Sequence, residues 1–291
     1  MNPHGMAPST PRNLVAAWLA EDIGRGDVTT NSVVPAGMHG RALIEAREPC
    51  TVAGMGVAAL CFELTSERFD GTLEFKEVVG DGGRVEAGDV LGRIEGPLAP
   101  ILTAERTALN LLARLCGVAT VTRRYVEAVD GTKARIVDTR KTTPGLRGLQ
   151  KYAVTVGGGS NHRFGLDDGV LIKDNHLVAA GGVTEALARA RAGAPHGLRI
   201  EVEVASLTEL EEALHAGAEA ILLDNMAPET VAEAVRANEG RALLEVSGGI
   251  NLDTVRSYAV TGVDLISVGA LTHSAPSIDL ALELLASELG E

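Results

Sequence analysis

The sequence is poor in aromatic residues and strongly acidic. Aromatic residues make up only 3% of the 291 positions, whereas modules that stack on nucleic-acid bases need aromatic side chains as platforms. The formal net charge is −13, and an acidic chain repels nucleic acid and anionic membrane surfaces. We therefore expect no nucleic acid and no membrane among its partners. Any anionic ligand would require a local reversal of charge.

Cysteine is also scarce, and long apolar runs are missing. The three cysteines, Cys50, Cys61 and Cys116, are odd in number and widely spaced, without a C-x-x-C pattern. This spacing supports neither a disulfide framework nor a zinc site, and it is typical of buried thiols in a reducing compartment. No uncharged apolar run of about 18 residues and no signal-peptide pattern occurs. These absences predict a cytoplasmic protein.

The pattern of apolar residues changes at Thr132. Before it, β-like stretches at 42–46, 73–79 and 90–95 alternate with glycine-rich turns, and helices are predicted at 14–21 and 102–115. After it, strand, loop and helix repeat, which favours a parallel sheet covered by helices. The predicted strands are 134–137, 170–172, 200–204, 220–223, 242–246 and 264–268, and the predicted helices are 184–192, 207–216, 228–237 and 252–260.

Charged or small polar residues stand at or just past the end of each predicted strand. They are Arg140, Lys173, Glu203, Asp224, Ser247 and Gly269. In a (β/α) barrel the carboxyl ends of the strands converge on one mouth, where the active site lies. A doubly wound open sheet is the alternative, but no G-x-G-x-x-G turn opens a helix. The sequence therefore predicts a barrel with six recognisable strands, and leaves its closure open.

The scarce lysines gather in one segment. The chain has five lysines, and three of them lie between Asp138 and His176. The cations of this segment are Arg140, Lys141, Arg147, Lys151, His162, Arg163, Lys173 and His176. The alternative is that they pair with nearby aspartates, such as Asp167 and Asp168, on a solvated face. Arginine forks and lysine point charges bind carboxylate and phosphate, so we interpret the segment as an anion site.

Glycine-rich segments and two carboxylates complete the candidate site. The runs 157–160, 247–249 and 268–270 would let backbone N–H groups approach a phosphate, although glycine also occurs in ordinary loops. Glu203 and Asp224 end neighbouring strands, which suits Mg²⁺ and ribose hydroxyls beside bound phosphates. The alternative for Glu203, or for Glu201 on the same face, is an ion pair with Lys173 or Arg140.

Motifs along nearly the whole chain resemble those of a single enzyme family. They are Glu105–Asn110, Asp138–Arg147, Gly157–Arg163, Leu171–His176, Glu201–Val204, Leu222–Asn225, Ser247–Gly249 and Val268–His273, with Glu21–Gly24 and Asp27–Thr30 near the start. In order and content they closely resemble quinolinate phosphoribosyltransferase, also called carboxylating nicotinate-nucleotide pyrophosphorylase. Val246 stands where that family usually has a small alanine or serine, which casts little doubt on the site.

The resemblance implies a two-domain fold and a shared active site. An N-terminal α/β sandwich, 1–115, would precede an open (β/α) barrel of about seven strands, 116–275. A C-terminal helix, 276–291, would pack back onto the sandwich. The chain would form a homodimer or a hexamer in which the sandwich of one subunit covers the barrel mouth of its partner.

The resemblance also implies the reaction and the role of each residue. The enzyme would transfer the phosphoribosyl group of phosphoribosyl pyrophosphate to quinolinate with Mg²⁺, releasing carbon dioxide and pyrophosphate and forming nicotinate mononucleotide for NAD biosynthesis. Lys141, Glu203 and Asp224 would be catalytic, the last two also lying by the metal. Substrates would be bound by Thr139, Arg140, His162, Arg163 and Lys173, by Arg106 of the neighbour, and by the phosphate loops Ser247, Gly248, Gly249, Val268, Gly269 and Ala270.

Three other functions are alternatives to this one. A relative of the same fold could act on a different anion, but Arg106, Arg140, His162 and Arg163 are all present here. The stretch 80–96 resembles a lipoyl or biotinyl carrier, which needs a lysine at its hairpin tip. No lysine occurs from Glu77 to Thr132, so a carrier is excluded. A phosphate-binding barrel without catalysis would bind substrate and not turn it over.

Overall fold

The computed structural model describes residues 12–69 and 72–285, which fall into two compact units. One unit takes in the described residues of Met1–Val121, Gly148–Gly157 and Ala275–Glu291, and the other comprises Thr122–Arg147 and Gly158–Ser274. Helix α4 (Leu98–Ala128) begins in the first unit and ends in the second. The domain limit that the sequence predicts after residue 115 falls inside this helix.

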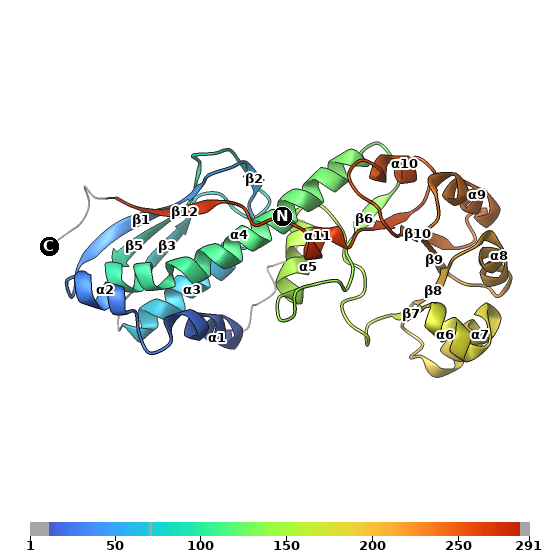
Figure 1. The fold of residues 1–291 in the computed structure, drawn as a ribbon, viewed down its shortest axis with the longest axis horizontal. Helices are drawn as coiled ribbons and strands as arrows, with labels where there is room; N and C mark the ends of the chain where they lie inside the picture. The colour runs from blue at the N-terminus through green and yellow to red at the C-terminus, as the bar shows by residue number, and fades with distance from the viewer. Residues whose placement is uncertain (1–11, 70–71, 286–291) are drawn as a thin grey trace. The chain divides into compact units, whose positions relative to one another are not determined.

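The first unit is built on a four-stranded antiparallel sheet (Figure 1). Its strands follow the order β12 (Leu280–Leu284), β1 (His39–Ala46), β5 (Val90–Pro97) and β3 (Glu74–Glu77). Alternate residues of β1 are buried, because successive side chains of a strand point to opposite faces. The unit also contains α1 (Arg12–Ile23), α2 (Val28–Val33), α3 (Met55–Arg68), α5 (Arg147–Val156) and the short pair β2 (Cys50–Thr51) and β4 (Arg84–Val85).

Helix α3, which the sequence pattern did not predict, covers the buried face of this sheet. Phe62 of α3 stacks on Phe75 of β3 with ring centroids 5.9 Å apart. The carboxylate of Asp81 accepts the backbone N–H groups of Gly54 and Met55 at 2.9–3.1 Å and so caps the start of the helix. Gly54 has φ +103°, in the left-handed region that favours glycine. Packing and capping therefore fix a helix whose apolar residues lack a clear single stripe.

The C-terminal segment is a strand, and the predicted helix at 276–291 is wrong over the residues that the structure describes. Strand β12 pairs antiparallel with β1, with Leu280 opposite Ala46. Leucines at 280, 282 and 284 recur with a period of two, which suits a strand better than a helix. An open edge of β1 provides the hydrogen-bonding partner. Residues 286–291 of the predicted helix lie outside the described part of the chain.

The second unit is a parallel sheet in the order β6, β11, β10, β9, β8 and β7. The strands are β6 (Arg135–Val137), β7 (Val170–Ile172), β8 (Ile200–Val204), β9 (Ala220–Asp224), β10 (Leu243–Ser247) and β11 (Leu265–Ser267). All six strands predicted after Thr132 are confirmed, with limits that differ by no more than a few residues. An isolated parallel bridge between Val137 and Ser160 extends the sheet beyond β6, where a seventh strand would stand.

Helices connect the strands and cover the outer side of the sheet (Figure 1). They are α6 (Asp174–Ala180), α7 (Val183–Gly193), α8 (Leu207–His215), α9 (Pro228–Asn238), α10 (Val255–Ala259) and α11 (Ala270–His273). The Ser206 hydroxyl accepts the Glu209 N–H at 3.2 Å and caps α8, and a proline opens α9. These connections bring the carboxyl ends of all the strands to the same edge of the sheet.

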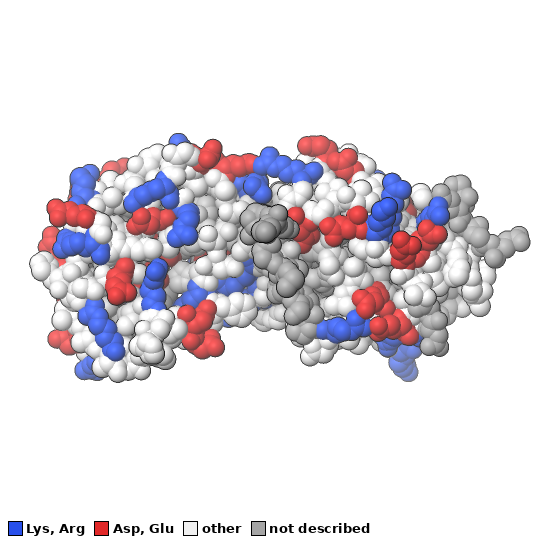
Figure 2. All heavy atoms as spheres, turned by 180° about the vertical axis from the view of Figure 1, so that it is seen from behind, with Lys and Arg blue, Asp and Glu red and all other residues white. Residues whose placement is uncertain are grey.

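Both signs of charge are interspersed on the surface. Figure 2 shows basic and acidic side chains mixed over the face that it displays. Within the described chain, no helix combines the length and the apolar character that crossing a bilayer requires. The face drawn in Figure 2 has no broad acidic patch among its described residues.

We predict that Gly117→Ala destabilises the first unit. A Cβ at Gly117 of α4 would lie 1.7 Å from the carbonyl oxygen of Pro276, and Ile278 is tied to the same helix by its N–H, which donates to Ala113 O at 3.0 Å. Two backbones must separate to admit a methyl group, at a cost of about 1–3 kcal/mol. Thermal unfolding should show a lower midpoint. Gly148→Ala, where a Cβ meets nothing within 4 Å, is the control, and an equal midpoint for both variants would contradict the prediction.

Candidate active site

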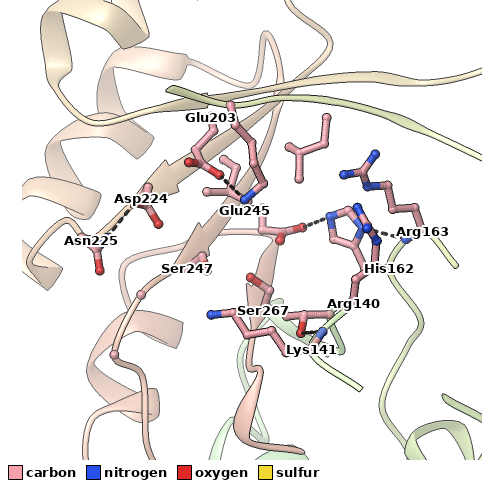
Figure 3. A pocket seen from close by; sticks show the side chains of 16 residues that line it. Arg140, Lys141, His162, Arg163, Glu203, Asp224, Asn225, Glu245, Ser247 and Ser267 are labelled. Carbon is pink, nitrogen blue, oxygen red and sulfur yellow. Dashed lines mark hydrogen bonds and ion pairs between the residues drawn. The ribbon is translucent and has the colours of Figure 1, made fainter. Parts of the chain in front are cut away.

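A cavity of about 540 Å³ opens at the carboxyl ends of the parallel strands (Figure 3). It lies within the second unit. The predicted site residues that line it are Thr139, Arg140, Lys141, His162, Arg163, Lys173, Glu203, Asp224, Ser247, Gly248 and Gly249. Leu171, Leu222, Asn225, Glu245 and Ser267 complete the lining. Residues that are more than 100 positions apart in the sequence therefore share one concave site.

Two arginines line the cavity. The Nε of Arg140 is buried and has no hydrogen-bond partner in the described structure, which is uncommon for a buried donor. Arg163 donates from Nη1 to the carbonyl oxygen of Gly169 at 3.0 Å. Burial and then the charge of Arg140 lower the pKa of the Arg163 guanidinium. The positive charges of Arg140 and Arg163 thus oppose each other. A bound anion would relieve this repulsion and provide a partner for the Arg140 Nε.

Acidic groups line the cavity opposite the arginines (Figure 3). Lys173 Nζ lies 3.1 Å from Glu203 Oε2, so the pairing that the sequence left as an alternative is present. The side chain of Lys173 is 48% exposed, and an ion pair of this kind contributes little to stability. Asp224 accepts a hydrogen bond at 2.6 Å from the amide of Asn225. Both carboxylates thus present oxygen atoms to the cavity without being committed to a strong partner.

The loops after β9 and β10 are locked to each other. The Asn225 N–H donates to Ser247 O at 2.9 Å, and Asn225 has φ +53°. At Gly248, with φ +107°, a Cβ would lie 2.1 Å from the Asn225 side-chain oxygen. At Gly249, with φ +61°, a Cβ would have no heavy atom within 4 Å. A side chain at Gly248 would clash with Asn225, and the positive φ values favour glycine at both positions. Because neither residue has a side chain, their backbone is exposed in the cavity wall.

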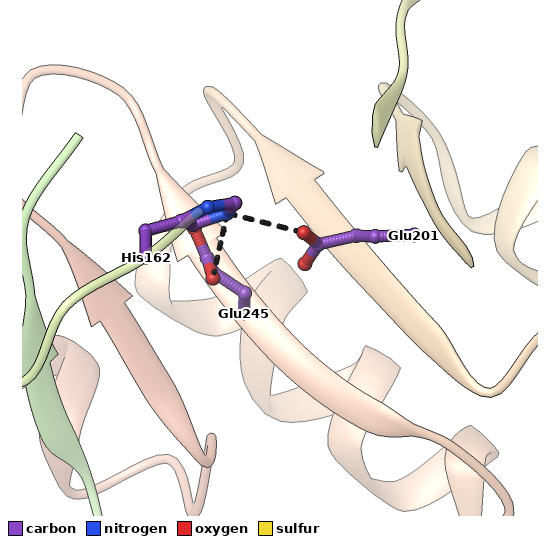
Figure 4. A group of neighbouring side chains, drawn as sticks. All are labelled: His162, Glu201 and Glu245. Carbon is purple, nitrogen blue, oxygen red and sulfur yellow. Dashed lines mark hydrogen bonds and ion pairs between the residues drawn. The ribbon is translucent and has the colours of Figure 1, made fainter. Parts of the chain in front are cut away.

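A buried cluster of three side chains lies inside the barrel (Figure 4). His162 Nε2 is 3.1 Å from Glu201 Oε2 and 3.6 Å from Glu245 Oε2. Glu245 is only 1% exposed. Burial, and then the charge of Glu201, raise the pKa of Glu245 to about 7. Since His162 and Glu245 also line the cavity, the cluster forms part of its floor.

Hydrogen bonds to the carboxylate of Asp138 and from the guanidinium of Arg147 hold the loops of the cationic segment. The buried carboxylate of Asp138 accepts the Asn161 amide at 2.6 Å and the His162 N–H at 2.9 Å. Arg147 donates to the hydroxyl of Thr142 at 2.9 Å and to Phe164 O at 3.2 Å. The carboxylate of Asp138 therefore organises these loops.

Three cations of the segment do not line the cavity. Arg147 makes the loop contacts given above. Lys151 is buried on α5, in the first unit. His176 accepts the Lys173 N–H on its Nδ1 at 2.9 Å, at the start of α6. Five of the eight cations of the segment therefore line the cavity, and three do not.

Four predicted site residues are absent from the cavity lining. Val268 is buried, and Gly269 and Ala270 begin α11. A Cβ at Gly269 would lie 3.0 Å from Lys141 Cδ, so this glycine leaves room for the lysine. Arg106 lies on α4 in the first unit, 64% exposed and 3.5 Å from Glu105. This ion pair joins two neighbouring residues of the same helix.

Sequence reasoning missed three polar residues of the cavity: Glu245, Ser267 and Asn225. A signal for two of them exists. Glu245 precedes Ser247 by two positions and Ser267 precedes Gly269 by two, so the alternation of side chains along a strand places each on the inner face. Asn225 follows Asp224 directly, and only its left-handed backbone turns its amide back towards that carboxylate.

Comparisons with known proteins agree over both units. The family model described as the quinolinate phosphoribosyl transferase C-terminal domain matches residues 118–283, and the corresponding N-terminal domain model matches residues 27–116. The chain is 48% identical over 279 residues to the carboxylating nicotinate-nucleotide pyrophosphorylase of Mycobacterium leprae, covering 94% of this chain and 96% of the relative. A probable enzyme of the same name from Bacillus subtilis is 42% identical over 273 residues, covering 94% and 93%.

Solved structures give the same result. The structure of the nicotinate-nucleotide pyrophosphorylase from Francisella tularensis superposes with a TM-score of 0.89 at 38% identity, covering 94% of this chain and 97% of that one. A structure from Ehrlichia chaffeensis with the same enzyme name has a TM-score of 0.88 at 37% identity, covering 94% and 98%. Sequence and fold are therefore similar over almost the full length.

The buried Glu245 should make stability depend on pH. Its folded-state pKa is raised from 4.5 to about 7, so the folded protein holds this proton more tightly than the unfolded chain. The stabilisation is present in full below pH 4.5 and is lost as the pH rises to about 7. Glu245→Gln removes the titration. The unfolding midpoint of the variant relative to wild type should therefore be higher at pH 8 than at pH 5. An equal difference at the two pH values would contradict the assignment.

Proposed function

The chain belongs to the quinolinate phosphoribosyltransferase family, and from this premise we propose that the cavity at the barrel mouth binds both substrates of the reaction. The enzyme is a pentosyltransferase, a nicotinate-nucleotide pyrophosphorylase of the carboxylating type, which acts in NAD biosynthesis. It transfers the phosphoribosyl group of phosphoribosyl pyrophosphate to quinolinate with loss of carbon dioxide. Nicotinate mononucleotide and pyrophosphate are the other products.

The unmet donor of Arg140 is the observation that carries the placement of quinolinate. Its buried Nε lies in a cavity that also contains Arg163 and His162. A pyridine dicarboxylate brings two adjacent anionic groups, and guanidinium forks bind carboxylates through paired hydrogen bonds. We assign the two carboxylates to these cations, with the hydroxyl of Thr139 as a further donor. The substrate then supplies the charge that the two arginines lack.

Phosphoribosyl pyrophosphate is assigned to the other side of the cavity. Lys141 and Lys173 supply mobile positive charge for its pyrophosphate. The loop of Ser247, Gly248 and Gly249, with Gly269 and Ala270 at the start of α11, offers backbone N–H groups for the 5′-phosphate. The Val268 N–H already donates to Val137 O at 3.0 Å, so Val268 supports this loop through its backbone. The support for this assignment is the backbone that these glycines expose, since a side chain at Gly248 would collide with Asn225.

The carboxylates of Glu203 and Asp224 fit a magnesium ion. Magnesium prefers oxygen ligands that it shares with substrate phosphates and water, and both side chains line the cavity. When bound, Mg²⁺ would neutralise the charge of the departing pyrophosphate. These two residues would hold the metal indirectly, together with the substrate. The ion pair of Glu203 with Lys173 would then be exchanged for contacts to the substrates.

The charges in the cavity suit the chemistry of the transfer. The ribose C1 becomes oxocarbenium-like as pyrophosphate leaves, and the carboxylates of Glu203 and Asp224 stabilise the positive charge. The pyridine nitrogen then bonds to C1. Once quaternised, the positively charged nitrogen stabilises the electron pair that stays on C2 when the bond to the carboxylate breaks and carbon dioxide departs, and this pair then takes up a proton. Lys141 is the third residue that we assign to catalysis, through the charge of the pyrophosphate.

Two features of the chain bear on its assembly and its compartment. Arg106 is largely exposed on α4, where it forms a weak ion pair with Glu105. We propose that Arg106 reaches the cavity of a second copy in a homodimer or larger assembly.

The three cysteines are free, which is what a reducing cytoplasm maintains, and we place the enzyme there.

Product formation tests the proposed reaction directly. Pure protein incubated with quinolinate, phosphoribosyl pyrophosphate and Mg²⁺ should form nicotinate mononucleotide and carbon dioxide in equal amounts, detected by chromatography and by trapping of the gas. Nicotinate in place of quinolinate should give no product, because it lacks the second carboxylate. Removal of Mg²⁺ with a chelator should abolish turnover. Equal rates with nicotinate, or full activity without a divalent cation, would contradict the assignment.

Mixing two inactive variants tests the sharing of sites between subunits. We expect both Arg106→Ala and Lys173→Ala to lower activity by about 100-fold or more, the effect of losing a charged contact to the transition state. Mixed and allowed to exchange subunits, they should regain activity, because one mixed site keeps both cations. Arg84→Ala, an exposed arginine of the first unit, is the control for the loss of a charge. Unimpaired Arg106→Ala, or the absence of any recovery, would argue against a shared site.

A further inference from the structure

Asn225 is a polar residue of the cavity wall to which the assignments above give no role. It follows Asp224 directly at the end of β9, and both residues line the cavity. Its side-chain amide donates a hydrogen bond to Asp224 Oδ2 at 2.6 Å, and Figure 3 shows the two side chains joined by this bond. The importance of the contact depends on what else holds the carboxylate.

The carboxylate of Asp224 makes no other hydrogen bond or ion pair within the described part of the chain. The second carboxylate of the pair, Glu203, is held differently, with Lys173 Nζ 3.1 Å away. A partly exposed side chain without a partner occupies several rotamers, and fixing it when a substrate binds costs conformational entropy. Among the described residues, the amide of Asn225 is therefore the group that fixes the direction of Asp224.

This contact depends on an uncommon backbone conformation. Successive side chains of a strand point to opposite faces, so two neighbouring residues do not normally meet. Asn225 has φ +53°, in the left-handed region, which asparagine tolerates better than most residues with a Cβ. The left-handed backbone turns the amide back onto Asp224. Only one other non-glycine residue in the described chain has a positive φ, Glu239 at the end of α9.

The turn at Asn225 packs directly on the loop that we assign to the 5′-phosphate. The Asn225 N–H donates to Ser247 O at 2.9 Å, and Ser247 stands beside Asp224 in the register of β9 and β10. A Cβ at Gly248 would collide with the side-chain oxygen of Asn225, so the glycine permits a close approach. The residue that orients the carboxylate is thus also the residue on which the phosphate loop rests.

We propose that Asn225 is a positioning residue for phosphoribosyl pyrophosphate: its amide holds the Asp224 carboxylate towards the ribose, and its backbone joins this carboxylate to the phosphate loop. The proposal rests on the function proposed above, which gives Asp224 a ribose and the loop a phosphate to bind. One methylene group separates the ribose ring from its 5′-phosphate ester. A site for both therefore needs a constant separation between carboxylate and loop, and setting it before substrate arrives lowers the cost of binding.

Steady-state kinetics with two variants of Asn225 test the role. Asn225→Gly keeps the left-handed backbone and removes the amide. It should lower kcat/KM for phosphoribosyl pyrophosphate about tenfold, the effect of one lost hydrogen bond to a charged group. Asn225→Asp keeps the shape of the side chain but cannot donate to Asp224, and it should lower kcat/KM at least as much. A wild-type kcat/KM in either variant would overturn the proposal.

Stability and quinolinate binding separate positioning from a loosened loop. The thermal midpoint of Asn225→Gly should stay close to that of wild type, because glycine adopts a positive φ without strain. The dissociation constant of quinolinate, measured by titration calorimetry, should not change. A lower midpoint together with weaker quinolinate binding would show a general loosening of the loops and overturn the proposal.

Glu239→Gly is the matched control for these measurements. It replaces the other left-handed residue by glycine, at a position outside the cavity lining. Its kinetic constants should equal those of wild type. Equal losses of kcat/KM in Glu239→Gly and Asn225→Gly would overturn the proposal, because the effect would then belong to the glycine and not to the missing amide.

Crystal structures without ligand give a readout that needs no turnover. We expect one orientation of the Asp224 carboxylate in wild type, on the amide of Asn225, and a different orientation or several orientations in Asn225→Gly. The same single orientation in both proteins would overturn the proposal. If wild type forms no nicotinate mononucleotide, the proposed function fails, while the two crystal structures still decide whether Asn225 orients Asp224.

Discussion

Arg140 and Arg163 line one cavity, where the charge of each opposes the charge of the other. Neither guanidinium is neutralised by a carboxylate at hydrogen-bond distance among the contacts of the described residues, and the buried Nε of Arg140 has no partner there. An arrangement of this kind is unfavourable on its own and becomes favourable when a dianion enters. The remaining features of the site follow from this constraint, since the fold must hold two like charges together within an acidic chain.

The barrel holds these two like charges together with the help of carboxylates that lie behind the arginines. Asp138 holds the loop that carries His162 through two hydrogen bonds, and the buried Glu201 and Glu245 lie on the far side of the imidazole. These groups supply negative charge close to the arginines without occupying the substrate cavity. Parallel strands make the arrangement possible, because their carboxyl ends deliver side chains from six places in the sequence to one mouth. The acidic net charge of the chain and its cationic site are therefore compatible.

Much of this architecture could be predicted from the sequence, and the failures have physical causes. Strands at 170–172 and 200–204 are apolar runs with clear ends, so their limits and the residues that follow, such as Lys173, were predicted correctly. Helix α3 was missed because its apolar residues, which include the partly exposed Leu60 and Leu64, do not form one narrow stripe. Strand β12 was taken for a helix because its partner strand lies over 230 residues away. Glu245 is one polar residue in an apolar strand, and only the tertiary fold places it near Glu201 and His162.

The central claim is that a dicarboxylate supplies the charge that Arg140 and Arg163 require. A crystal structure of the protein soaked with quinolinate tests this most directly. We expect the ligand in the cavity at the strand ends, with one carboxylate within hydrogen-bond distance of the Arg140 Nε and the other on the guanidinium of Arg163. Quinolinate bound elsewhere, or an Arg140 Nε that stays without a partner in the complex, would contradict the claim.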